Sequence, residues 1–330
     1  MISRRHFLTA STSTAVAGVL PGLATPTRAQ VIAKTARMLV GFPPGGSLDV
    51  VARLLVEQMK DYAPSLIVDN RPGAGGRIAL DALKGSEADG SILALTPGDQ
   101  ITLFPHVYQK LNYNPLRDFV AVATVCTFPF LITIGPMVPA NVTTLAQFVE
   151  WCRSNPKLAT YGSPGAGTRP HFLGATLARS AGFEFVHLPY KGGAPAIQDL
   201  LGGQIPATIS VFSNALPHVQ SGSLRALATT GPRRSALLPD VPTARDAGYA
   251  GIEAVEWFGI FVPANTSADI VSALHASVGR ALETDAVKTG LARQAFDVAN
   301  TSPGDFSKLI KADTERWGEV VKTSGFKPIE

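Results

Sequence analysis

The sequence contains few of the residues from which disulfide scaffolds and metal centres are built. Only two of its 330 residues are cysteines, Cys126 and Cys152, which is too few for a disulfide framework or a cysteine-rich zinc site. The six histidines show no spacing typical of metal ligands. We therefore expect no metal and no cofactor. We interpret both cysteines as buried free thiols, and a single bridge between them is the alternative that an oxidising compartment permits.

Long hydrophobic runs and complete enzyme motifs are also lacking. The most apolar segment after the N-terminus, residues 120–134, is interrupted by polar residues and Pro129, so it does not predict a membrane span. Ser47 stands where a phosphate-binding P-loop requires lysine. The residues around Ser163 lack the glycine spacing of a hydrolase nucleophile elbow. Neither a nucleotide site nor a serine hydrolase is predicted.

The N-terminus has the pattern of an export signal. Arg4 and Arg5 precede a moderately apolar stretch, residues 9–23, and a small-residue site ends at Ala29. This pattern is typical of a twin-arginine signal peptide, with ordinary secretion as the alternative. We expect residues 1–29 to be removed by cleavage near Ala29 and the mature protein to lie in the periplasm.

The basic character of the chain belongs largely to this signal. Residues 1–29 contain three arginines and no acidic residue, so their removal lowers the formal net charge by three from +4. The composition of the mature chain therefore gives no reason to expect a nucleic-acid partner.

Strands and helices alternate along the mature chain, which favours an α/β fold with mostly parallel sheets. A first βαβαβ run is expected: a strand at residues 37–42, a helix from 47 to 59, a strand that begins at 66–68, a helix from 77 that leads to Asp89 and Gly90, and a strand at 91–96. A second run is expected at residues 159–163, 169–180, 183–189, 194–201, 205–212 and 224–230. Two such runs predict two lobes.

Two apolar segments, residues 119–134 and 252–262, lie between the runs and are expected to cross between the lobes. The segment 268–321 has helical periodicity and is expected to pack back on the first lobe. The predicted division is lobe 1 at residues 30–125, lobe 2 at residues 126–253, and a returning segment with C-terminal helices at residues 254–330.

Each lobe contains one glycine-rich turn between a strand and a helix. The first turn is residues 42–49 (FPPGGSLD), in which Ser47 is expected to cap the helix, and the second turn is residues 163–168 (SPGAGT). The first N–H groups of a helix have no intrahelical partner and carry the positive end of the helix dipole, so such a turn can hold an anion. Two of them predict two lobes that close on one small anionic ligand.

Five short motifs carry a more specific resemblance. They are FPPGGSLD at residues 42–49, NRPGAGG at 70–76, PYKGGAPA at 189–196, LLGGQ at 200–204 and PDVPT at 239–243. In this order and spacing the chain resembles the Bug receptors, the periplasmic solute-binding components of tripartite tricarboxylate transporters. The resemblance implies a two-lobe periplasmic-binding-protein fold, type II-like, in which each lobe is a mostly parallel sheet flanked by helices. It also implies that both turns grip one ligand carboxylate through backbone amides.

The candidate ligand-binding residues follow from the two turns and from nearby strand ends. Those in the turns are Phe42, Pro44, Gly45, Gly46, Ser47, Asp49, Ser163, Gly165, Ala166, Gly167 and Thr168. Those outside the turns are Thr96, His171, Lys191, Phe212 and Ser213, with Asp99 and Asn214 of equal standing. Each of the latter has a structural alternative, in a loop, in the core or in solvent. Asp49 has one as well, because it could orient the first turn instead of contacting ligand.

We interpret the chain as a periplasmic receptor that captures a small carboxylate, of organic-acid or acidic amino-acid type. It would deliver this ligand unchanged to the membrane components of a tripartite transporter, and we expect a monomer. The alternatives are an exported α/β enzyme acting on a small carboxylate and the ligand-binding subunit of a signalling system.

Overall fold

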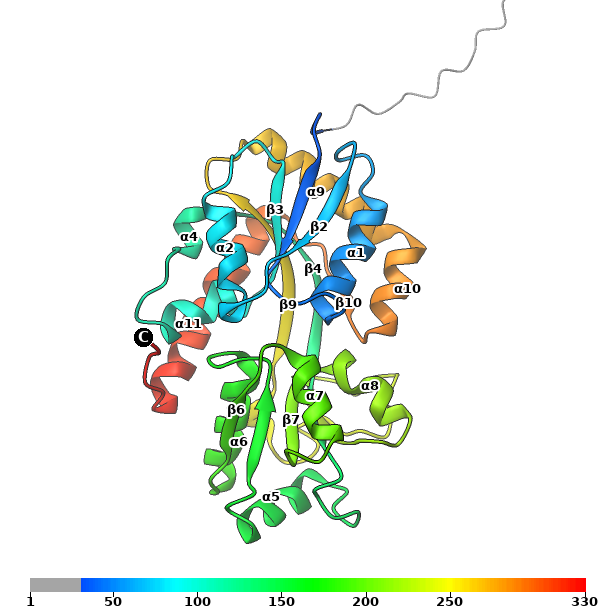
Figure 1. Ribbon diagram of the computed structural model, residues 1–330, viewed down its shortest axis with the longest axis vertical. Helices are drawn as coiled ribbons and strands as arrows, with labels where there is room; N and C mark the ends of the chain where they lie inside the picture. Colours follow the sequence, from blue (N-terminus) through cyan, green and yellow to red (C-terminus); the bar gives the residue numbers. More distant parts are fainter. Residues whose placement is uncertain (1–30) are drawn as a thin grey trace, which may run out of the picture.

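The computed structural model describes residues 31–330, so the predicted signal peptide lies outside the described residues. Two lobes lie end to end along the long axis of the molecule (Figure 1). No helix in the described part of the chain is both long and apolar enough to cross a membrane.

The first βαβαβ run is confirmed. It consists of β1 (Ala36–Val40), α1 (Ser47–Gln58), β2 (Leu66–Asn70), α2 (Arg77–Lys84) and β3 (Ile92–Pro97). The three strands pair in parallel, with β1 between β2 and β3. Helix α1 forms because Val51, Ala52 and Leu55 repeat at helical spacing and bury one face against the sheet. The short elements η1 (Ala74–Gly76), η2 (Asp99–Leu103), α3 (Phe104–Val107) and α4 (Pro115–Asp118) complete this part of the lobe.

The second run is confirmed as well. It consists of β5 (Thr160–Ser163), α6 (Arg169–Ala181), β6 (Val186–Pro189), α7 (Gly193–Leu201), β7 (Ala207–Val211) and β8 (Arg225–Thr229). The helix α5 (Leu145–Ser154) precedes this run, and α8 (Phe212–Gln220) lies between β7 and β8. Strand β5 pairs in parallel with both β6 and β7. The parallel sheets expected from the alternation are therefore present inside each lobe.

Two long strands join the lobes, as predicted. They are β4 (Phe119–Ile134) and β9 (Val255–Pro263), and Figure 1 shows both running from one lobe towards the other. Strand β4 pairs antiparallel with β9 as far as Pro129 and antiparallel with β7 from Phe130 onward. The expected lobe boundary at residue 125 falls inside β4. The crossing strands thus add an antiparallel ladder to the parallel sheets of the lobes.

The C-terminal segment returns to lobe 1 as α9 (Ala268–Glu283), α10 (Asp285–Arg293), β10 (Asp297–Val298) and α11 (Pro303–Ser324). Helices α9 and α10 pack on α1, and Ser277 Oγ of α9 donates a 2.7 Å hydrogen bond to Asp61 in the loop after α1. Helix α11 also contacts α6 of lobe 2. It therefore touches both lobes beside the crossing strands.

Two details of the prediction can be compared directly with the structure. Ser47 is not the N-cap of α1: Gly46 takes that position in an extended conformation, no side chain caps the helix, and Ser47 is its first residue. Glycine supplies no capping oxygen, so the amides of the first helical turn stay available. Cys126 and Cys152 are buried free thiols, as expected.

Candidate functional site

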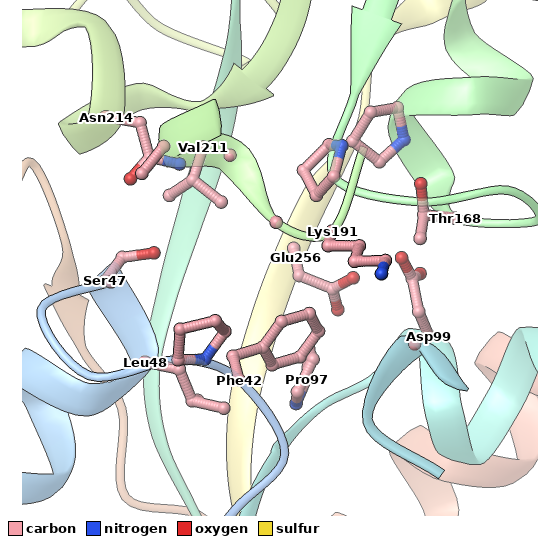
Figure 2. Close-up of a pocket in the computed structure, with 18 of the residues that line it drawn as sticks. Phe42, Ser47, Leu48, Pro97, Asp99, Thr168, Lys191, Val211, Asn214 and Glu256 are labelled. Atoms are coloured by element: carbon pink, nitrogen blue, oxygen red, sulfur yellow. The ribbon is translucent and has the colours of Figure 1, made fainter. Parts of the chain in front are cut away.

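A cavity of about 360 Å³ lies between the lobes, where the first turn faces the crossing strands and lobe 2. Figure 2 shows the start of α1, the strand β9 and loops of lobe 2 around it. Nine of the predicted site residues line this cavity: Phe42, Pro44, Gly45, Gly46, Ser47, Asp99, Thr168, Lys191 and Asn214. The first turn thus supplies most of the predicted contacts.

The first turn presents the N-terminus of α1 to the cavity. Gly45 has a φ of +81°, a left-handed conformation that favours glycine, and this lets the chain turn sharply into the helix. No acceptor within residues 31–330 takes a hydrogen bond from the backbone N–H of Gly46, Ser47 or Leu48. These residues line the cavity, so the unpaired N–H groups at the start of α1 are available to a ligand inside it.

Asp49 holds the first turn in place and does not line the cavity. Its carboxylate accepts hydrogen bonds from Gly45 N at 2.9 Å, Arg53 Nε at 2.8 Å and Asn70 Nδ2 at 2.9 Å. Burial alone would raise the pKa of the Asp49 carboxyl, but these donors lower it below the ordinary value. Asn70 also donates to Phe42 O at 3.1 Å. The NRPGAGG motif therefore supports the first turn from the neighbouring strand.

The second turn meets the cavity only at its ends, through Pro164 and Thr168. Inside the turn, Gly165 N donates to Ser163 Oγ at 3.3 Å and Thr168 Oγ1 donates to Gly165 O at 2.8 Å. Ser163, Gly165 and Ala166 do not line the cavity. Gly167 has a φ of +72°, and a Cβ there would lie 2.3 Å from Val107 Cγ1 of lobe 1. Gly167 therefore allows a close contact between the lobes.

Two stacked histidines lie beneath the second turn. The rings of His171 and His187 are 3.8 Å apart, Gly167 N donates to His171 Nδ1 at 3.1 Å, and His187 Nε2 lies 2.7 Å from Ser163 Oγ. Burial lowers the pKa of His171 to about 4 and that of His187 to about 3, so both are neutral at neutral pH. The pair of Ser163 and His187 does not line the cavity. It supports the turn.

The remaining predicted residues occupy varied positions. Thr96 is buried and its hydroxyl bonds to Gln100. Phe212 is fully buried in the core of lobe 2, and Ser213 does not line the cavity. Asn214, the third residue of α8, does line it.

Several lining residues were missed by the sequence reasoning. The apolar wall includes Pro97, Phe104, Phe128, Phe130 and Phe258. Aromatic residues in buried strands are read as core, so no signal in a single sequence marks them as lining. The N-terminus of α7 also reaches the cavity, through residues 192–195. The glycines of the PYKGGAPA motif carry that signal, but the prediction includes only Lys191 of this motif.

A buried charge cluster closes one end of the cavity. Arg169, the first residue of α6, is 1% exposed, and we call it, with its three carboxyl partners, the Arg169 cluster. Its guanidinium nitrogens lie 3.0 Å from Asp99 Oδ1, 3.1 Å from Glu256 Oε1 and 2.9 Å from Asp313 Oδ2. Burial raises the pKa of Asp99, and it raises that of Glu256 well above the usual range, although Arg169 opposes both shifts.

The Arg169 cluster joins elements from both lobes. Asp99 lies in η2 and Asp313 in α11 of lobe 1, Glu256 lies on the crossing strand β9, and Arg169 belongs to lobe 2. The backbone N–H of Arg169 also donates to Asp99 Oδ2 at 2.9 Å. A carboxylate of lobe 1 thus occupies one N-terminal amide of α6.

The geometry supports binding of a small anion in a mostly apolar, enclosed space. Among residues 31–330, no group of three or more histidine, cysteine or acidic side chains is arranged to hold a metal ion. The cavity places the α1 N-terminus on one side and two carboxyl groups, Asp99 and Glu256, on another. Such a site recognises charge at its ends and shape along its walls.

Comparisons with known proteins agree with this geometry. A model of the tripartite tricarboxylate transporter family receptor matches residues 51–326. The chain is 33% identical over 313 residues to protein BugT of Bordetella pertussis, covering 93% of this chain and 94% of BugT.

Solved structures of related proteins have the same fold. A Rhodopseudomonas palustris protein, Rpa4515 with adipate, has a TM-score of 0.84 and 29% identity over 92% of this chain and 100% of that one. MatC of the same species, with bound malate, has a TM-score of 0.80 and 29% identity over 87% and 98%. With its two lobes and its cavity at the crossing strands, this chain belongs to the receptor family of the tripartite tricarboxylate transporters, which are periplasmic solute-binding proteins and not enzymes.

Proposed function

We propose that this chain is exported and captures a small carboxylate between its lobes, as a monomer that delivers the ligand to the membrane components of a tripartite transporter. The observation that carries the proposal is the cavity at the N-terminus of α1. There the N–H groups of Gly46, Ser47 and Leu48 have no acceptor in the described chain. A carboxylate satisfies such donors and interacts favourably with the helix dipole.

The relatives support a carboxylate as the ligand class. Two structures of similar fold were solved with adipate and with malate, and both acids carry carboxylate groups at their ends. In our proposal the first turn grips one carboxylate of the ligand, and the second turn approaches from lobe 2 through Thr168. The apolar wall around Phe42 and Phe128 then contacts the body of the ligand.

The grip can be tested by removing a single backbone donor. Ser47 is the first residue of α1, a position where proline is well tolerated, and Gly46 before it has the extended φ of −74° and ψ of 166° that a following proline requires. Ser47→Pro therefore deletes one N–H with little change to the helix. Ser47→Ala is the matched control, because it removes the hydroxyl and keeps the N–H.

The measurement is calorimetric titration with the tightest-binding acid from a panel of mono-, di- and amino-carboxylates. A hydrogen bond to a charged group contributes about 1.5–3 kcal/mol, so Ser47→Pro should weaken binding roughly tenfold to hundredfold. Ser47→Ala should bind nearly as the wild type does. Equal affinity of Ser47→Pro and wild type would refute a grip by this amide.

A second pair of variants separates the two turns. Gly46→Val places a branched side chain at the cavity beside the first turn, and Gly165→Val places one inside the second turn. A Cβ meets nothing closer than 3.5 Å at Gly46 and 3.4 Å at Gly165, so both should fold. Gly46→Val should lose at least roughly a hundredfold in affinity, as expected for two or three lost donors, and Gly165→Val should lose affinity only if the second turn also grips the ligand. Gly251→Val is the control, at an exposed glycine outside the cavity lining. Normal binding by Gly165→Val would restrict the grip to the first turn.

A further inference from the structure

We propose that the ligand carries, besides its carboxylate, a cationic or N–H donor group that contacts Glu256. This inference rests on the proposed function, because it assigns the second end of the same ligand. It makes Glu256 a specificity-determining residue of the cavity.

Glu256 is a buried carboxyl group with an unused acceptor. It lies near the start of β9, is 2% exposed and lines the cavity, where Figure 2 shows it beside Asp99 and Lys191. Its Oε1 lies 3.1 Å from Arg169 Nη1 and accepts a hydrogen bond from Trp257 N at 2.9 Å. Its Oε2 accepts no hydrogen bond from an N–H or hydroxyl group in the described chain, and the only other polar contact of this carboxyl is a hydrogen bond shared with the carboxyl of Asp99. A buried carboxylate oxygen without a donor is costly, so a ligand that supplies one gains affinity.

The charges around Glu256 do not balance. Three carboxyl groups lie within 4.0 Å of the Arg169 guanidinium: those of Glu256, Asp99 of η2 and Asp313 of α11. Three acids therefore surround one base. Asp313 is further satisfied by Trp257 Nε1 at 2.8 Å and does not line the cavity. Two of the three acids, Asp99 and Glu256, line the cavity, so the excess negative charge of the cluster lies where a ligand can reach it.

A buried acid without a counter-charge can be neutralised by a proton or by a cation. A proton can serve this role at Glu256, because burial raises the pKa of its carboxyl well above the usual range. A ligand ammonium placed against Glu256 would favour the carboxylate instead and release that proton. The α1 N-terminus favours a negative group at the other side of the cavity. The two sides together suit a ligand with charges of opposite sign.

Lys191 is the competing cation. It lines the cavity from the loop before α7, is exposed, and forms no ion pair in the described chain. If Lys191 neutralised Glu256 when the lobes close, a ligand amine would bring no advantage. The experiment therefore compares acids that differ only in the amine.

The probes are two matched series. One contains hexanoate, adipate and 6-aminohexanoate, and the other contains benzoate, terephthalate and 4-(aminomethyl)benzoate. Each is titrated into the wild type, Glu256→Gln and Asp313→Asn. Asp313→Asn is the matched control, because it removes one carboxylate from the same cluster at a position that does not line the cavity.

We expect the amine-bearing acid to bind the wild type about tenfold or more tighter than its plain and dicarboxylate partners, in at least one series. Glu256→Gln should abolish that preference and Asp313→Asn should keep it. Titration in two buffers of different ionisation enthalpy should show proton release on amine binding to the wild type and none with Glu256→Gln.

Equal or weaker binding of the amine-bearing acids would overturn the inference and leave the proposed carboxylate receptor intact. An amine preference that persists in Glu256→Gln would also overturn it. If no acid of either series binds, the proposed carboxylate function fails and the inference fails with it.

Discussion

Replacing Arg169 by methionine should destabilise the protein strongly. Methionine keeps the length of the side chain but removes a guanidinium that contacts three carboxyl groups within 3.1 Å. The replacement also deletes the hydrogen bond from Nη1 to Val255 O at 2.7 Å. Because Arg169 is 1% exposed, water does not replace these contacts.

The expected loss in free energy of unfolding is about 3–5 kcal/mol at neutral pH, the usual cost of removing one partner from a buried charge pair. Urea denaturation followed by circular dichroism measures it. Arg233→Met is the control: Arg233 contacts Asp297 at 2.9 Å, but both side chains are mostly exposed, so its loss should stay below about 1 kcal/mol.

The pH dependence separates charge from packing. Without Arg169, Asp99 and Glu256 have folded-state pKa values raised still further above their unfolded values. Groups of this kind stabilise the fold fully below the unfolded pKa, and that contribution is lost as the pH rises through the folded pKa. The deficit of Arg169→Met should therefore shrink towards about pH 4 and grow as the pH rises from there through neutrality. A deficit under about 1 kcal/mol at neutral pH, or one independent of pH, would refute the electrostatic reasoning.

Three further predictions follow from burial and from the N-terminus. Burial raises the pKa of Cys152 to about 12 and also raises that of Cys126, so a thiol reagent should modify neither cysteine in the native protein. In denatured, unreduced protein the reagent should modify two thiols, and a count of zero would reveal a disulfide. Because burial raises the pKa of Glu256, Glu256→Gln should be more stable than the wild type at neutral pH and equal to it near about pH 4, and a constant difference in denaturation midpoint would contradict this. Replacing Arg4 and Arg5 by lysine should leave precursor in the cytoplasm, whereas an unchanged periplasmic yield on a blot would indicate ordinary secretion.

The fold could be predicted from the sequence because its signals are local and repeated. Alternating apolar strands and amphipathic helices define both lobes. The apolar segments that form β4 and β9 are longer than the other strands, and this length indicates that they cross between the lobes. The antiparallel pairing of these two strands was not predicted. It depends on which strand each one meets after crossing between lobes, and no local pattern encodes that choice.

The site was predicted in part, for a related reason. The first turn lines the cavity because a strand, a glycine turn and a helix start place it there in any α/β lobe. Asp49 lies in the same motif but points to Gly45 and Asn70, since its short side chain reaches the turn and not the cavity. Residue type alone could not decide between these two roles.

The second turn shows what a local signal leaves out. Its glycines and the start of α6 have the same anion-binding pattern as the first turn, yet Arg169 N donates to Asp99, which lies 70 residues away in the sequence. Whether a helix N-terminus is available depends on whether the protein's own carboxylate already occupies it. Asp99 can reach α6 only because the crossing strands bring the lobes together, and Arg169 holds it there at 3.0 Å. The availability of the α1 amides, and the partial occupation of those of α6, are therefore properties of the assembled lobes.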